Sequence, residues 1–193
     1  AIAEALDAER ANGKLRSPIH GLPISVKDVI HVKGMPTSSG SKVMEGFMPD
    51  DDATAVRLLR EAGAIIIGKA HTHEFALGVT TPQSRNPWDT SRDPGGSSGG
   101  SAITISTGMS LLSLGTDTRA SIRVPASLCG TLGYKPTYGL VSTDGIVTLS
   151  WTMDHAGLMG RTSEDVAIMM NIIQGFDAKD SGTLDQPKDD YTD

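Results

Sequence analysis

The stretch Asp50-Asp-Asp-Ala-Thr-Ala-Val-Arg-Leu-Leu-Arg-Glu-Ala-Gly-Ala-Ile-Ile-Ile-Gly68 decides the fold class of this chain. Its three leading aspartates supply capping groups and favourable charge for a helix over residues 53–62, and Gly63 ends that helix. The unbroken apolar run over 64–68 is typical of a strand buried on both faces. A helix that leads directly into a buried strand predicts an α/β fold, in which helices flank a sheet.

Further elements are predicted on both sides of this stretch. They are a helix over 1–11, a strand that ends at Lys27 after a turn at Gly21, a helix over 98–107, a strand over 109–114 and a helix over 164–173. Thr162 or Ser163 is the expected cap of the last helix. Glycine and proline punctuate residues 121–160, where the pattern assigns no element. Residues 79–96 form a Pro/Asn/Asp-rich loop, and a loop of that length in a compact domain is usually functional.

The composition fits one globular domain. A chain of 193 residues can bury a sizeable core, and 38% hydrophobic with 21% charged residues excludes a disordered chain. The net charge of -6 argues against a nucleic-acid surface, and no apolar run reaches the roughly 18 residues of a membrane span. A single cysteine excludes an internal disulfide framework, so a cytoplasmic setting is expected. We assign residues 1–176 to the domain and the polar residues 177–193 to a tail or linker.

Two serine- and glycine-rich segments stand out, Pro94–Ser101 and Gly115–Pro125. The first has three general explanations. A phosphate-binding loop would need a lysine where Ser101 stands. A nucleophile elbow over 96–100 would need a preceding strand, and a later catalytic histidine for which His155 is the only candidate. A flexible linker would join domains, whereas this segment lies between two apolar elements.

A set of motifs in a fixed order explains both segments better. Pro94-Gly-Gly-Ser-Ser-Gly-Gly-Ser-Ala102, followed by Leu114-Gly-Thr-Asp-Thr-Arg-Ala-Ser-Ile-Arg-Val-Pro125, resembles the central signature of the amidase signature family. Further matching motifs are Gly21-Leu-Pro-Ile-Ser-Val-Lys-Asp28, Gly63-Ala-Ile-Ile-Ile-Gly-Lys69, Glu74-Phe-Ala76 and Gly133-Tyr-Lys-Pro-Thr-Tyr-Gly139. The resemblance runs from about residue 1 to residue 178. It implies a mixed β-sheet flanked by helices and, because the family's domain is much longer, a fold that is incomplete in this chain.

The resemblance also implies hydrolysis of a carbon–nitrogen (amide) bond by a Ser-Ser-Lys triad. Ser121 matches the family's nucleophile, Lys27 its base, and Ser97 its bridging serine, whose peptide bond is cis in the family. Neutral Lys27 would take a proton from Ser97, which takes one from Ser121, and water would hydrolyse the acyl-enzyme. Because lysine is charged in water, the relay needs burial to lower the pKa of Lys27. Apolar residues at 24, 26, 29 and 30 are consistent with that burial.

The nucleophile motif departs from the family at two positions. The family usually has Gly-Gly-Ser where this chain has Arg119-Ala120-Ser121. Backbone N–H groups of Thr118, Arg119, Ala120 and Ser121 are implied to form the oxyanion hole. Main-chain donors do not depend on the side chain, provided that neither Arg119 nor Ala120 needs a positive φ.

Three functions follow from these motifs. The first is an amidase that acts on a small-molecule amide without cofactor or metal, without direct nucleic-acid or membrane contact, and with a homodimer left open. The second is a glutaminase-type A subunit of a tRNA-dependent amidotransferase, which would have partner subunits. The third is an inactive fragment or pseudoenzyme, favoured by Arg119-Ala120 and the short length. The stretch from His71 to Pro82 favours the stand-alone amidase over the amidotransferase component.

Other reactive side chains near the motifs have simpler explanations. His71 and His73 have metal-ligand spacing, but no further ligand follows at a sensible spacing, so no metal is predicted. Asp117 and Arg123 are predicted to brace the nucleophile loop as a charged, hydrogen-bonded pair. Cys129 lies among apolar residues and is predicted to be a packed thiol.

Overall fold

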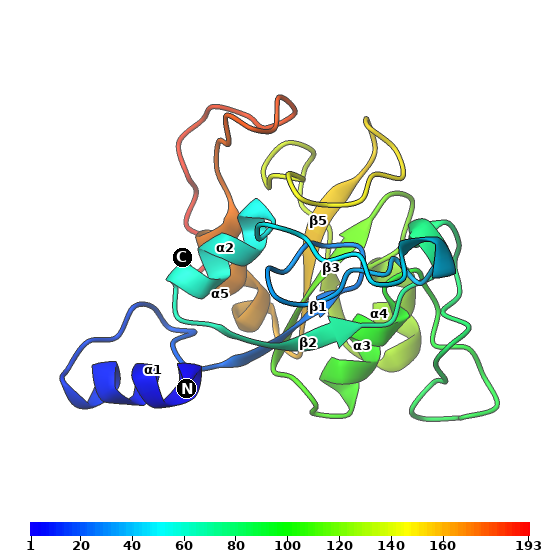
Figure 1. The fold of residues 1–193 in the computed structure, drawn as a ribbon, viewed down its shortest axis with the longest axis horizontal. Helices are drawn as coiled ribbons and strands as arrows, with labels where there is room; N and C mark the ends of the chain where they lie inside the picture. The colour runs from blue at the N-terminus through cyan, green and yellow to red at the C-terminus, as the bar shows by residue number, and fades with distance from the viewer.

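A five-stranded mixed sheet, in the order β2-β1-β3-β5-β4, forms the centre of the computed structural model, which describes all residues 1–193 (Figure 1). The strands are β1 Pro23–Lys27, β2 Ile65–Ala70, β3 Leu112–Asp117, β4 Leu132–Tyr134 and β5 His155–Gly160. β1 pairs in parallel with β2 and β3, whereas β5 is antiparallel to β3 and β4. The expectation of a mixed sheet is confirmed.

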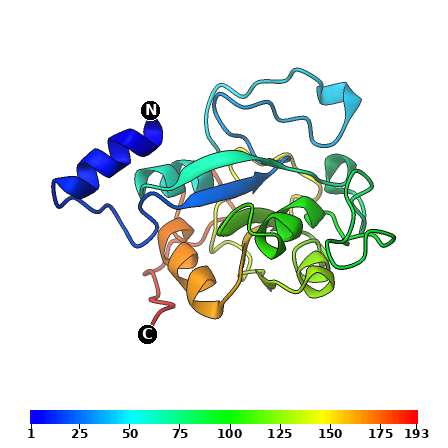
Figure 2. The same cartoon turned by 90° about the horizontal axis from the view of Figure 1, so that it is seen from below.

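Helices cover both faces of this sheet. They are α1 Ile2–Ala11, α2 Thr54–Glu61, α3 Gly99–Ser106, α4 Arg123–Cys129 and α5 Ser163–Ile173, with short 3-10 turns η1 Lys42–Met44 and η2 Glu74–Ala76. The larger buried cluster lies under α2 and α5, and a smaller one, with Ile105, Ile122 and Met159, lies under α3 and α4. α1 extends from the edge of the molecule in both views (Figure 1 and Figure 2). No helix has the length and hydropathy needed to cross a bilayer.

Three elements, α4, β4 and β5, lie in the glycine- and proline-rich stretch to which the sequence pattern assigns none. Pro125 is the third residue of α4, where a backbone N–H has no intrahelical partner to lose. In β5, a Cβ on Gly157 would lie 2.5 Å from the backbone oxygen of Tyr134. Proline and glycine therefore mark a helix start and a close strand contact here, which composition alone does not distinguish from a loop.

One detail of the predicted strand over 64–68 is wrong. Ile67 of β2 is 48% exposed, so the strand is not buried on both faces, and β2 also lies at the edge of the sheet. An apolar run indicates a strand but shows neither whether both of its faces are covered nor how many strands it pairs with. The cap of α5 is resolved in favour of Thr162, which forms a reciprocal capping box with Asp165.

The C-terminal residues 177–193 hydrogen-bond to the elements that precede them. The backbone N–H of Thr143 donates to Asp180 at 2.7 Å, and the Gln174 side chain donates to the backbone oxygen of Asp189 at 2.6 Å. The assignment of this segment to a tail or linker, after a domain at 1–176, stays a prediction.

A substitution at Gly100, in the first turn of α3, tests how closely that helix approaches the residues that follow β2. A Cβ on Gly100 would lie 2.4 Å from the backbone nitrogen of His71, whereas one on Gly68 would meet nothing within 4 Å. Gly100→Ala is expected to lower the free energy of unfolding by about 1–3 kcal/mol through overpacking. Gly68→Ala is the matched control, with an expected change of about 0.5 kcal/mol or less. Denaturant unfolding measures both, and equal stability of the two variants would contradict the close approach.

Candidate active site

Lys27, the last residue of β1, has no exposed surface. Its Nζ donates to the hydroxyl oxygens of Ser97 and Thr116, each at 2.7 Å, and approaches the backbone oxygen of Thr116 at 3.4 Å. Burial lowers the pKa of Lys27 from 10.5 to about 7, against the opposing influence of the Asp117 and Asp154 carboxylates. The amine is therefore partly neutral at neutral pH, as a proton acceptor must be.

Ser97 lies in the glycine-rich segment before α3 and is fully buried. The Gly96–Ser97 peptide bond is cis, as the family resemblance implies. The next residue, Ser98, joins this segment to the nucleophile segment, because its N–H donates to the backbone oxygen of Ser121 at 3.0 Å. Its hydroxyl donates to the backbone oxygen of Thr116, also at 3.0 Å. The structure thus brings the segments of Lys27, Ser97 and Ser121 together across β1, β3 and the start of α3.

Ser121 lies two residues before the first residue of α4. Its side chain is 8% exposed and makes no hydrogen bond within the chain. A link from Ser121 to Ser97 is therefore not among the contacts of this structure, and the relay stays a prediction. Catalytic hydrogen bonds are often long in ligand-free structures and shorten when substrate binds.

The backbone from Thr118 to Ser121 has free donors. None of these four N–H groups donates to another atom of the chain, and their role as an oxyanion hole stays a prediction. Neither Arg119 nor Ala120 has a positive φ, so the loss of the family's two glycines introduces no backbone strain at these positions. The Arg119 side chain is exposed.

Asp117, at the end of β3, organises the turn that carries these donors. Its fully buried carboxylate accepts from Nε and Nη2 of Arg123, each at 3.1 Å, and from the backbone N–H of Ile122 at 3.1 Å. Burial raises the pKa of Asp117, but the hydrogen bonds from Arg123 and Ile122 outweigh that effect, and the net pKa is lowered. The predicted charged pair is confirmed, and its ionised form ties the end of β3 to the start of α4.

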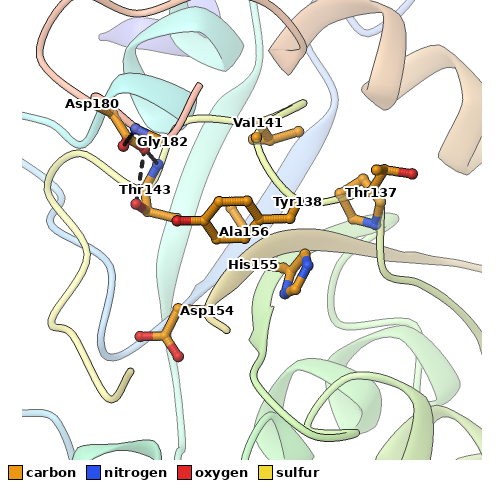
Figure 3. Close-up of a pocket in the computed structure, with 11 residues that line it drawn as sticks. Thr137, Tyr138, Val141, Thr143, Asp154, His155, Ala156, Asp180 and Gly182 are labelled. Carbon is orange, nitrogen blue, oxygen red and sulfur yellow. Dashed lines mark hydrogen bonds between the residues drawn. The ribbon is translucent and has the colours of Figure 1, made fainter. Parts of the chain in front are cut away.

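A pocket lined by residues that include Tyr138, Asp154 and His155 holds no member of the predicted triad (Figure 3). Figure 3 shows the Tyr138 ring between His155 and the hydrogen-bonded pair of Thr143 and Asp180. The Tyr138 ring meets the His155 ring edge-on, with centroids 5.6 Å apart. Asp154, on the rim of this pocket, accepts from the hydroxyl of Thr118 at 2.5 Å. Through this hydrogen bond, one residue of the pocket wall holds the first residue of the donor segment.

Two residues of the site escape sequence reasoning, Thr116 and Asp154. The signal for Thr116 is its place in the second serine-rich segment, where a hydroxyl precedes Asp117. Asp154 has no such signal, because it lies 33 residues after Ser121 and reaches Thr118 only through the pairing of β5 with β3. Long-range strand pairing is not visible in local sequence patterns.

The other reactive side chains lie outside this constellation. His71 contacts the Ser84 hydroxyl at 2.9 Å through Nδ1, and no group of three or more His, Cys, Asp or Glu side chains is placed to hold a metal ion. Cys129 is fully buried, and burial raises the pKa of its thiol to about 11, which fits the predicted packed thiol. Trp88 donates through Nε1 to the backbone oxygen of Cys129 at 2.8 Å.

Known proteins match this chain along its whole length. The family model Amidase covers residues 1–193. The A subunit of glutamyl-tRNA(Gln) amidotransferase from Nitratidesulfovibrio vulgaris is 50% identical over 99% of the chain, and that from Maridesulfovibrio salexigens is 48% identical over 99%. The chain spans 40% of the length of each of these relatives.

Solved structures agree with these matches. The peptide amidase of Stenotrophomonas maltophilia superposes with a TM-score of 0.93 at 41% identity, over 99% of this chain and 42% of its own. The A subunit of glutamyl-tRNA(Gln) amidotransferase from Thermotoga maritima superposes with a TM-score of 0.85 at 46% identity, over 87% of this chain and 38% of its own. The chain therefore belongs to the amidase family, whose signature its two serine- and glycine-rich segments resemble.

Proposed function

We propose that this chain carries the catalytic core of an amidase in which Ser121 is the nucleophile, Ser97 the bridging serine and Lys27 the base. The observation that carries the proposal is the 2.7 Å contact between Lys27 Nζ and the Ser97 hydroxyl in a fully buried setting. A buried lysine whose pKa is lowered to about 7 can act as a base near neutral pH, which an ordinary surface lysine cannot.

The orientation of the Lys27 amine supports its role. A neutral amine has two N–H groups and one lone pair. The hydroxyl and backbone oxygens of Thr116 lie 2.7 and 3.4 Å from Nζ and can accept both N–H groups. The lone pair then faces the third neighbour, the Ser97 hydroxyl. Thr116 thereby directs the basic electron pair toward the proton it must remove.

The mechanism follows in two halves. In the first, Ser121 Oγ attacks the amide carbon while its proton passes to Ser97 and the Ser97 proton passes to Lys27. The carbonyl oxygen becomes negative, and the free N–H groups of residues 118–121 stabilise it. The carbon–nitrogen bond then breaks, and the leaving amine takes a proton that returns from Lys27 through Ser97. In the second half, water attacks the acyl-enzyme along the same proton path, which releases the acid and restores Ser121.

A second function is supported by the relatives. The A subunits of the amidotransferases are 48% and 50% identical to this chain, against 41% for the peptide amidase. The same site would then release ammonia from glutamine inside a multi-subunit enzyme. The relatives thus favour protein partners, whereas the stretch from His71 to Pro82 favours a stand-alone amidase. A homodimer, a small-molecule amide substrate and a cytoplasmic setting stay predictions.

A fluorophosphonate probe tests the proposal, because it labels only an activated serine. We expect one adduct, on Ser121, located by peptide mass spectrometry and absent in Ser121→Ala. Ser127→Ala, which removes an exposed serine from α4, is the matched control and should label like the wild type. No labelling of a folded sample would favour the inactive-chain hypothesis. Ammonia release from glutamine, compared with release from a peptide amide, then separates the two active functions.

A further inference from the structure

The long loop over residues 79–96 is not accounted for by the triad or by the oxyanion donors. Both of its ends contact the Ser97 segment, and its middle contacts the end of α4. Thr81, near its start, has no exposed surface. The Thr81 hydroxyl donates to the backbone oxygen of Gly95 at 2.9 Å and accepts from the backbone N–H of Gly99 at 3.1 Å. One side chain thus holds the backbone two residues before Ser97 and two residues after it.

A carboxylate fixes Thr81 in turn. Asp93 accepts from the backbone N–H of Gly95 at 2.7 Å and from the backbone N–H of Thr81 at 3.3 Å. The two backbones pack too closely for a side chain at either glycine: a Cβ on Gly96 would lie 2.0 Å from the backbone oxygen of Thr80, and one on Gly99 would lie 2.3 Å from Thr81 Oγ1. The start and the end of the loop therefore close on each other around Ser97.

The middle of the loop is tied to α4. The Asn86 side chain donates to the backbone oxygen of Leu128 at 2.9 Å, and the Trp88 indole donates to that of Cys129 at 2.8 Å. α4 begins directly after the Ser121 segment. The loop consequently connects the backbone that carries Ser97 to the helix that follows Ser121.

Ser97 needs such external support. Four of the six residues from Gly95 to Gly100 are glycines, and glycine restricts the backbone least. Yet the Ser97 hydroxyl must stay within hydrogen-bond reach of Lys27, and a misplacement of about 1 Å can cost about 10²-fold in rate. The required precision has to come from contacts outside the segment.

We propose that Thr81 is a positioning residue that sets Ser97 between Lys27 and Ser121, and that residues 79–96 brace the Ser97 segment against α4. The inference rests on the proposed function, because it concerns the same triad. Thr81 acts through Ser97 and touches no reacting atom.

The test compares Thr81→Val, Thr81→Ser and Thr183→Val. Valine keeps the shape of threonine but leaves the Gly95 oxygen and the Gly99 N–H without their partner, whereas serine keeps the hydroxyl. Thr183 is the matched control, because its hydroxyl, like that of Thr81, bonds backbone groups, here of Asp177 and Asp180, and it lies outside the triad. The measured quantities are the maximal rate constant of Ser121 labelling by a fluorophosphonate, the probe concentration at half-maximal rate, and the melting temperature.

Thr81→Val is expected to lower the maximal labelling rate constant by about 10–100-fold with an unchanged half-saturating concentration. Thr81→Ser should label within about threefold of the wild type, because it keeps both hydrogen bonds. Thr183→Val should lose stability and keep the wild-type labelling rate. Should Thr81→Val not fold, Asp93→Asn is the milder variant, with the same selective loss expected at about tenfold.

A folded Thr81→Val that labels like the wild type would overturn the inference and leave the proposed function untouched. So would equal loss of labelling in Thr183→Val, because the effect would then be one of general stability. A folded wild-type chain that fails to label would overturn both the inference and the proposed function.

Discussion

Lys27→Met is expected to lower amide turnover by about 10⁴-fold, the scale seen when a member of a catalytic triad is removed. Methionine approximates the length and apolar character of the lysine stem but has no group that accepts a proton. Lys27→Arg is expected to lose nearly as much, because a guanidinium does not deprotonate in proteins. Turnover of a peptide amide and of glutamine by the two variants measures the effect.

The pH dependence of kcat/KM in the wild type is a second test of the same role. Only the neutral amine of Lys27 can accept a proton. We therefore expect kcat/KM to fall tenfold for each pH unit below the pKa of about 7 and to level off above that pKa. Activity of Lys27→Met within tenfold of the wild type, or a wild-type profile that does not change between pH 5 and 8, would refute the role of Lys27 as base.

The wild type is also expected to gain about 2 kcal/mol of stability between pH 7 and pH 9 relative to Lys27→Met. The folded-state pKa of Lys27 is about 7, whereas its ordinary value is 10.5. Between these two values the unfolded chain holds a proton that the folded chain has released. The free energy of unfolding therefore rises with pH from 7 to 9, and this gain is lost when the pH is lowered from 9 to 7.

Denaturant unfolding of both proteins at the two pH values measures this difference. The burial-raised pKa of Cys129, about 11, affects stability in the opposite direction as pH rises, but it does so in both proteins and cancels in the comparison. Identical pH dependence in the wild type and Lys27→Met would mean that Lys27 is not held in a desolvating site.

The positions of the three triad residues could be predicted from the sequence because each residue lies in a short local motif. One motif surrounds Lys27, another Ser97 and a third Ser121. The structure places these motifs in contact through the parallel pairing of β1 with β3 and the packing of α3. What local patterns could not supply is the long-range support. Asp154 reaches Thr118 from the position just before β5, and Thr81 reaches Gly99 from the preceding loop, and neither contact has a sequence signature.

Arg119 and Ala120 likewise depend on the backbone conformation, which the local sequence does not give. Sequence shows that two glycines are replaced, but only the backbone conformation says whether glycine was needed. Because neither residue has a positive φ, the replacement is sterically allowed, and the donors from Thr118 to Ser121 stay free. The edge position of β2 was equally invisible, since the apolar run over 64–68 would look the same in a central strand.

The placement of Lys27 has a consequence for how such a site could be tuned. β1 is paired on both sides, with β2 through Ala70 and with β3 through Leu114, so the backbone that carries the base is held by hydrogen bonds from two strands. Both serines, by contrast, lie outside the strands. Because the base is fixed by this pairing, a partner or ligand that switches the site on or off is expected to act by shifting the serines relative to Lys27. Variation in loop length could then change substrate and control without disturbing the proton acceptor.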